Sequence, residues 1–329
     1  MRRLVCALAV LALACGFRHT RSIAEDDAGQ PADPVRGEYL VKAVAGCGEC
    51  HTPRSRDGKL DMSKWLAGVE NRFDLEPDDP AHGAISAPNL TPHDSGLGGW
   101  RRAEIRRAIL DGIDDHDRPL HPVMPSYVFH NLEPADADAI VAYLLTIPAI
   151  DHQVSERQPL SIPLMRAATP VPEARIPRTT LKAKDLNYKR AEHGRYLAAQ
   201  VGFCMDCHTA WRVDADEPLA LDRLFAGGRA FSAAEWVVTD PETPPIVFSY
   251  NVTPHGSGIK GWTPEQIATA LKKGLDDEDK PLCRPMPSGS NGAHGQLTDA
   301  DALDIGWYLT TIPPIEGGEI PECTRAAAK

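Results

Sequence analysis

The chain has 329 residues, enough for about two domains of ordinary size. Lys and Arg number 35 against 46 Asp and Glu, so the formal net charge is −11, which excludes the basic surface typical of nucleic-acid-binding proteins. Apolar residues make up 42% of the chain but aromatic residues only 6%, and 29 prolines accompany 26 glycines. This composition indicates a loop-rich protein whose thin aromatic core leaves room for something other than side chains in its middle.

The first 24 residues are typical of an export signal. Two arginines precede an apolar run of about 14 residues, which is too short to span a membrane comfortably but suits the core of a signal peptide. Small residues permit cleavage after Ala14 or Ala24. Lipid attachment at Cys15 and an uncleaved anchor remain open as alternatives. We therefore predict a signal peptide over residues 1–24 and an exported, periplasmic protein, which contacts a membrane only if Cys15 is lipidated or the signal is retained.

After the signal, the chain contains one unit twice. Three segments recur in the same order: Gly37–Leu40 as Gly194–Leu197, Asn89–Trp100 as Asn251–Trp262 with 8 of 12 positions identical, and Tyr143–Pro148 as Tyr308–Pro313. The offset grows from 157 to 162 and then to 165 residues, as small loop insertions would produce. A period this long indicates a duplicated domain and not a solenoid. We predict domains over residues 35–150 and 188–316, a proline-rich linker over 151–187, and a C-terminal tail over 317–329.

Each copy is predicted to be all-α, in the order helix, loop, helix, loop, helix. Apolar residues recur at i, i+4 and i+8 in the middle helix: Ile105, Ile109 and Ile113 in the first copy, and Ile267, Leu271 and Leu275 in the second. The segment Thr263–Gln266 is a capping box with proline at the first helical position, whereas Arg101 stands at the capping place in the first copy and supports the helix start less well. The last helix ends at Pro148 or Pro313, and no strongly alternating run predicts a strand.

Each copy carries the motif Cys-x-x-Cys-His. The two motifs are Cys47, Cys50 and His51, and Cys204, Cys207 and His208. Two thiols at this spacing can each form a thioether with one vinyl group of the same porphyrin, and the next residue's imidazole can then bind the iron. A lone Cys-x-x-Cys also suits half a zinc site, a redox pair or a disulfide, but further short-spaced Cys or His pairs and a βαβ pattern are absent from the sequence. Two copies in an exported chain therefore predict two covalently attached haem c groups.

The second axial ligand of each iron is predicted to be a methionine. Of the six methionines, only Met124 and Met286 occupy matching places, 73 residues after His51 and 78 after His208. A methionine is more often core filler, but these two recur within Pro-Val-Met-Pro and Pro-Met-Pro, and proline stiffens a loop that must hold a thioether on iron. A His/Met pair fills both axial positions and raises the reduction potential. We expect each iron to exchange electrons without readily binding a substrate.

These motifs resemble tandem class I cytochrome c domains, in particular the dihaem and multihaem cytochromes that accompany periplasmic dehydrogenases, such as the cytochrome subunits of alcohol and gluconate dehydrogenases. The family pattern is Gly-x-Tyr-Leu before the haem motif, an Asn-[Ile/Leu]-Thr-Pro segment leading to Gly-x-Trp, then Met-Pro and a final Tyr-Leu helix. It covers roughly residues 35 to 150 and 188 to 316. The resemblance implies an all-α fold wrapped around covalent haem c, and redox protein partners: a dehydrogenase as donor and an oxidase or another cytochrome as acceptor.

Other residues are weaker candidates for the site. His93 and His255 match across the copies and could be axial ligands, although a polar loop role is the simpler interpretation. His121 aligns with Cys283 just before each methionine, and either could displace it as ligand. Trp100 and Trp262 could donate to haem propionates, and Arg72 and Arg229 could pair with them; ordinary packing and a solvated surface are the alternatives.

Cys283 has a better predicted role in a disulfide. Once the two cysteines of the signal and the four of the haem motifs are set aside, only Cys283 and Cys323 remain. Two leftover cysteines in an exported protein predict a disulfide between them. This bond would tie the C-terminal tail beside the second methionine loop.

The leading functional hypothesis is a periplasmic dihaem cytochrome that transfers single electrons, either as a carrier or as the electron-transfer subunit of an oxidoreductase. Its acidic surface predicts docking onto a basic patch, with an association rate that falls as salt rises. The alternative is a dihaem redox enzyme, either a cytochrome c peroxidase or a thiosulfate dehydrogenase. Such an enzyme would need a releasable sixth ligand or a Cys or His ligand, for which His121 and Cys283 are the hints.

Overall fold

The computed structural model describes residues 32–55, 58–74, 84–155, 167–212, 217–232, 246–318 and 320. The predicted signal peptide and Cys15 lie outside these residues. Within them, no helix combines the length and the apolar character that crossing a membrane requires.

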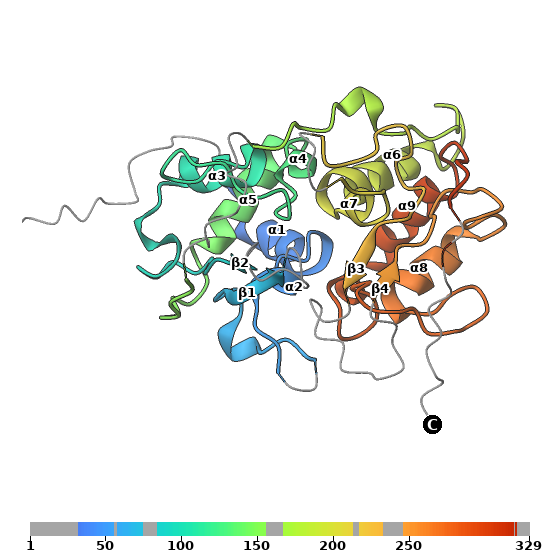
Figure 1. Cartoon of the computed structure of the whole chain (residues 1–329). Helices are drawn as coiled ribbons and strands as arrows, with labels where there is room; N and C mark the ends of the chain where they lie inside the picture. Colours follow the sequence, from blue (N-terminus) through green and yellow to red (C-terminus); the bar gives the residue numbers. More distant parts are fainter. Residues whose placement is uncertain are drawn as a thin grey trace, which may run out of the picture.

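The described chain forms two lobes that lie side by side and repeat one order of elements (Figure 1). The first lobe, residues 32–155, contains α1 (Pro34–Tyr39), the π-helix η1 (Leu40–Val44), α2 (Gly48–His51), the 3-10 helix η2 (Met62–Lys64), β1 (Val69–Asp74), β2 (Ala84–Ala87), η4 (Leu97–Gly99), α3 (Arg102–Asp111), α4 (Ser126–Phe129) and α5 (Pro134–Leu144). The second lobe, residues 188–318, contains α6 (Tyr188–Tyr196), η6 (Leu197–Val201), α7 (Cys204–Cys207), β3 (Ala230–Ser232), β4 (Ile246–Phe248), α8 (Pro264–Lys273), η7 (Ala293–Gln296) and α9 (Asp299–Leu309). Between them lies the short η5 (Glu173–Arg175).

The first and last helices of each lobe cross at a glycine. A Cβ on Gly37 of α1 would lie 1.9 Å from the carbonyl oxygen of Ala139 in α5, and a Cβ on Gly194 of α6 would lie 1.9 Å from that of Asp304 in α9. A side chain at either position would overlap backbone, so only glycine allows this approach. The repeated Gly-x-Tyr-Leu segment therefore contains the crossing point of each lobe.

The middle helices begin as the sequence indicates, but by two means. Thr263 Oγ1 accepts from the Gln266 amide at 3.2 Å, and the Thr263 amide donates to Gln266 Oε1 at 2.8 Å, so α8 has the predicted capping box. Arg101 has no accepting side chain. Instead its amide donates to Glu104 Oε2 at 2.7 Å, which satisfies one of the donors at the start of α3.

The prediction of an all-α fold is confirmed for the main elements but misses two antiparallel ribbons, β1–β2 and β3–β4. In β1 the register shifts between Val69 and Phe73, and Asn71 has a φ of 47°, so alternation of apolar and polar residues is broken. In the second lobe each paired strand has three residues. Strands this short and irregular leave no period-2 signal in a sequence.

The two lobes are joined by reciprocal contacts from the repeated tyrosines. Tyr39 of the first lobe donates to Asp301 and accepts from the Thr298 amide at 3.2 Å, both at the start of α9. Tyr196 of the second lobe donates to Asp136 Oδ2 at 2.8 Å and accepts from the Glu133 amide at 3.2 Å, both at the start of α5. These hydroxyls fix each lobe against the other's last helix. We call these contacts the tyrosine clasps.

The described parts of the predicted linker pack on the lobes. Val171 is buried, and its amide donates to the Tyr127 carbonyl of the first lobe at 2.9 Å. The Pro177 carbonyl accepts from Tyr308 of the second lobe at 2.8 Å and from Arg195 at 3.1 Å. Residues 171–177 therefore contact both lobes.

Candidate functional site

The two Cys-x-x-Cys-His motifs occupy single helical turns that begin the candidate sites. α2 ends at His51, and α7 spans the second pair of cysteines. All four motif cysteines are free: Cys47, Cys50, Cys204 and Cys207. Burial raises the pKa of each, to about 12 for Cys47 and Cys204, so they are neutral thiols at pH 7.

The motif histidines are held by one nitrogen and leave the other available. Nδ1 of His51 bonds to the carbonyl of Pro88 at 2.9 Å, and Nδ1 of His208 bonds to the carbonyl of Tyr250 at 2.7 Å. Because a carbonyl only accepts, Nδ1 carries the proton and Nε2 keeps a lone pair for a metal. Burial lowers the pKa of His51 to about 4 and also lowers that of His208, which keeps both imidazoles in the neutral, ligating form.

The repeated Asn-x-Thr-Pro segment positions the carbonyls that these histidines use. Asn89 follows Pro88 directly; its Oδ1 accepts from the Thr91 amide at 2.9 Å and its Nδ2 donates to the Ile150 carbonyl at 2.9 Å. Asn251 follows Tyr250 and makes the same two bonds in the second lobe, with partners Thr253 and Ile315. The asparagine thus joins the loop at the histidine to the segment that leaves the last helix.

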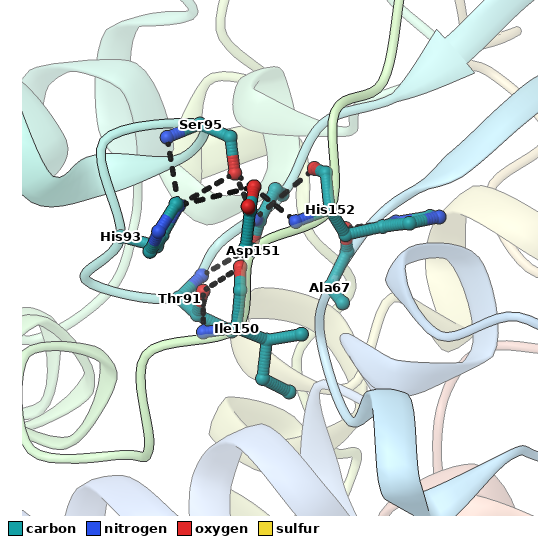
Figure 2. Close-up of polar contacts among 8 residues, drawn as sticks. Ala67, Thr91, His93, Ser95, Ile150, Asp151 and His152 are labelled. Atoms are coloured by element: carbon teal, nitrogen blue, oxygen red, sulfur yellow. Dashed lines mark hydrogen bonds and ion pairs between the residues drawn. The ribbon is translucent and has the colours of Figure 1, made fainter.

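His93 and His255 face their own loops. Figure 2 shows Nδ1 of His93 bonded to Ser95 Oγ, at 2.9 Å, with Asp151 beside it at 3.7 Å. His255 makes the equivalent bond to Ser257 at 3.0 Å. In both lobes the serine amide also donates back to the same ring nitrogen, so Nδ1 of each histidine is part of a local turn.

The two methionine loops share one backbone turn. The Met124 amide donates to the His121 carbonyl at 3.0 Å, and the Met286 amide donates to the Cys283 carbonyl at 3.2 Å. In each loop a serine two residues later donates its amide to the methionine carbonyl at 2.8 Å. Both methionine side chains are half-buried against the apolar core. Their role as axial ligands stays a prediction.

His121 and Cys283, which lie three residues before the two methionines, have different surroundings. His121 is buried, its Nδ1 accepts from the Val123 amide at 3.1 Å, and its ring meets the edge of Trp211 with centroids 6.5 Å apart. Cys283 is in a disulfide and so offers no thiolate to an iron. Its expected partner, Cys323, lies outside the described residues, so that pairing stays a prediction.

Sequence reasoning missed a buried carboxylate inside each motif. Glu49 and Asp206 stand just before the second cysteine and are 3% and 6% exposed. Each forms a buried ion pair, Glu49 with Arg54 and Asp206 with Arg229. The signal was available, since an acidic residue occupies the same place in both motifs.

The candidate propionate partners lie close to these motifs. Arg72 is buried, and its Nη2 donates to the Glu49 carbonyl at 3.5 Å; Arg229, at the matching position, donates to the Asp206 carbonyl at 3.1 Å. The alternative of a solvated surface is therefore wrong for both arginines. Trp100 and Trp262 are half-buried against the core, and contact between their indoles and a propionate stays a prediction.

In each lobe the residues present fit a haem c. Two unpaired thiols in one helical turn are available for thioether bonds, and the following imidazole has a free Nε2 whose tautomer is fixed by a carbonyl. A methionine thioether lies on the same backbone turn in each lobe and packs against the core.

Comparisons with known proteins identify a cytochrome c domain in this chain. Residues 35–148 match the family model described as cytochrome c. The chain is 27% identical to a diheme cytochrome c-type protein of Cereibacter sphaeroides, over 94% of this chain and 97% of that protein. It is 27% identical to the cytochrome c subunit of alcohol dehydrogenase (quinone) from Gluconacetobacter polyoxogenes, over 85% of this chain and 56% of the subunit. A segment of 118 residues is 36% identical to the fructose dehydrogenase cytochrome subunit of Gluconobacter japonicus, of which it covers 22%. The chain thus spans only part of these dehydrogenase subunits.

Proposed function

We propose that this chain, which contains a cytochrome c domain over residues 35–148, is a dihaem cytochrome c that transfers single electrons between a dehydrogenase and a downstream acceptor in the periplasm. The domain implies one covalently bound haem c. The proposal adds a second haem in the second lobe. Three observations support it: the second lobe repeats the same motifs, it repeats the order of the main elements, and one relative is named as a diheme cytochrome. The observation that carries it is the same histidine geometry in both lobes, with Nδ1 on a carbonyl and Nε2 free.

In this proposal the side chains of each lobe have defined roles. Cys47 and Cys50 would attach the first haem, and His51 and Met124 would bind its iron. Cys204, Cys207, His208 and Met286 would do the same in the second lobe. When bound, haem supplies one-electron exchange between ferrous and ferric iron. An imidazole and a thioether as the two protein ligands would favour the ferrous form and would leave no open position for a substrate, which suits a carrier.

The partners follow from the relatives and from charge. Several relatives are named as cytochrome subunits of alcohol, fructose and gluconate dehydrogenases, which supports a dehydrogenase as electron donor here. An oxidase or another cytochrome is the proposed acceptor. With a net charge of −11, we expect the chain to dock on basic surfaces at a rate that falls as salt is added.

The test is to produce the full chain with c-type cytochrome maturation and to count its haems. We expect a pyridine haemochrome assay to give two covalent haems per chain, and the weak far-red sulfur-to-iron band of ferric haem to have the intensity of two methionine-ligated irons. Hydrogen peroxide should not be turned over. A single haem per chain would contradict the proposal. Peroxide turnover by a chain with two haems, one of which binds cyanide readily, would also contradict it and favour a dihaem peroxidase.

A further inference from the structure

We propose that Tyr127 is a positioning residue that links the methionine loop of the first lobe to the haem-attachment motif of the second, and raises the reduction potential of the second-lobe haem. This inference rests on the proposed function, since it requires a haem at Cys204 and Cys207.

The hydroxyl of Tyr127 reaches across the boundary between the lobes. Tyr127 is the third residue after Met124, lies in α4, and is 1% exposed. Its hydroxyl donates to Asp206 Oδ1 and accepts from Nε1 of Trp211 at 3.2 Å. Asp206 stands between Cys204 and Cys207. One buried side chain of the first lobe therefore contacts the attachment motif of the second.

The carboxylate that Tyr127 contacts has no bulk water to screen its charge. Asp206 is 6% exposed, and its other oxygen pairs with Arg229. The guanidinium of Arg229 lies over the ring of Trp211 at 4.7 Å and over that of Phe231 at 5.2 Å. In such an interior a charge acts over a longer range than in water. The groups that donate to Asp206 therefore determine how strongly its negative charge acts on the haem that Cys204 and Cys207 would attach.

Among the described residues, no side chain of the second lobe makes the corresponding contact with the attachment motif of the first. The sequence Met124-Pro-Ser-Tyr127 matches Met286-Pro-Ser-Gly289, so glycine stands where the first lobe has tyrosine. Glu49, the counterpart of Asp206, receives the backbone amide of Ala293 at 3.0 Å instead. A side chain makes the contact in only one direction, so its removal should affect the two haems unequally.

The direction of the effect follows from electrostatics. The hydroxyl points the positive end of its dipole at the Asp206 carboxylate, which offsets part of the negative charge beside the second haem. Without it, that site becomes more negative and favours ferric iron over ferrous. The potential of the second-lobe haem should fall, and that of the first-lobe haem should change less.

The test is Tyr127→Phe in the full-length dihaem protein, which removes one oxygen atom and keeps the ring. Matched controls are Tyr39→Phe and Tyr196→Phe, which remove the hydroxyls of the tyrosine clasps and leave Asp206 untouched. Each protein is titrated spectroelectrochemically. The wave that belongs to the second lobe is identified as the one lost in Cys204→Ser/Cys207→Ser. Haem content and the far-red band establish that each variant is assembled.

We expect the second-lobe wave to move to lower potential in Tyr127→Phe and both waves to stay in place in the controls. Unchanged waves in Tyr127→Phe, or an equal shift in Tyr39→Phe, would overturn the inference and leave the proposed function standing. Failure of the wild-type second lobe to hold haem would overturn both. If Tyr127→Phe fails to assemble, Asp206→Asn serves as second variant; it should raise the second-lobe potential by removing the charge, and an unchanged potential would overturn the inference.

Discussion

The two lobes of this protein have the same internal supports but different outer surfaces. In both, a glycine allows the first and last helices to cross, and an asparagine holds the loop whose carbonyl accepts from the motif histidine. The ribbons differ. In the first lobe, Ser86 of β2 contacts Ser155 at 3.4 Å, from the segment that leaves the last helix. In the second, Ile246, Phe248 and Tyr250 are 53%, 36% and 49% exposed along and just after β4.

This difference separates the parts of the repeated unit that recur in both lobes from those that differ. Contacts that set the tautomer of the histidine recur almost unchanged, as the proposed haem ligation would require in each lobe. The side chains of the ribbon surface differ between the lobes: Ala84, Ser86 and Pro88 stand where the second lobe has Ile246, Phe248 and Tyr250. His51 is buried whereas His208 is only half-buried. We expect the two haems to share their ligands and to differ in environment.

The largest expected effect comes from variants that remove the haem of one lobe and keep that of the other. Cys47→Ser/Cys50→Ser should leave a chain with haem only in the second lobe, and Cys204→Ser/Cys207→Ser one with haem only in the first, because both thioether bonds of a site are lost. The pyridine haemochrome assay should give half the wild-type haem in each. Full haem content in either variant would refute the assignment of that motif.

The next effect concerns the axial methionines. Met124→Leu and Met286→Leu keep an apolar side chain of similar volume and remove the sulfur, so each should abolish half of the far-red band and lower the potential of one haem. Met62→Leu is a matched control, since Met62 is 59% exposed, and it should leave the band intact. Retention of the full band in both loop variants would show that other residues bind the irons.

Asparagine substitution tests whether the shared support contributes equally in both lobes. Asn89→Ala leaves the buried Thr91 amide without its acceptor and removes one of the two donors to the Ile150 carbonyl, which keeps the Thr91 hydroxyl. Asn251→Ala does the same to Thr253 and Ile315. Each should lower the free energy of unfolding by about 2–3 kcal/mol, as measured by denaturant titration. A marked inequality would mean that the two supports are alike in geometry but not in energy.

The smallest expected effect is the pH dependence of the stability that Asp136, a member of the tyrosine clasps, contributes. Burial alone would raise the pKa of Asp136, but hydrogen bonds from Arg36 and Tyr196 outweigh burial and lower it below the ordinary value of 3.8. A carboxyl whose pKa is lower in the folded state contributes stability above its unfolded pKa, and this contribution is lost as the pH falls through the folded value. Asp136→Asn should cost about 1 kcal/mol at pH 7 and less below pH 3.8. A cost in denaturant titrations that is the same at pH 7 and pH 3 would contradict this account.

Much of the site could be predicted from sequence because its signals are local and repeated. The Cys-x-x-Cys-His spacing, the proline-flanked methionines and the capping box at Thr263 each lie within a few residues, and their recurrence separates them from chance. The bonds from Asn89 to Ile150 and from Asn251 to Ile315 were not predicted, because these partners lie 61 and 64 residues away. The ribbons were missed because Asn71 interrupts β1 and the other strands are short.

The contact between Tyr127 and Asp206 was beyond sequence reasoning for a different reason. Tyr127 and Asp206 are 79 residues apart and each fits an ordinary local role, one in a helix and one in a motif. Only the packing of one lobe on the other shows that they meet. The buried carboxylates Glu49 and Asp206 could have been noticed as a matched pair, but their arginine partners, Arg54 and Arg229, occupy positions that do not correspond in the repeat.

The connection over residues 171–177 has a consequence for kinetics. Val171 is hydrogen-bonded to Tyr127 of the first lobe, and Pro177 to Tyr308 of the second. The span therefore holds the two lobes at a fixed separation and is not a flexible linker. Electrons passing from one iron to the other would then tunnel over a constant gap. Their transit time should be indifferent to solvent viscosity, whereas exchange with an outside protein, which relies on diffusion, should slow as glycerol is added.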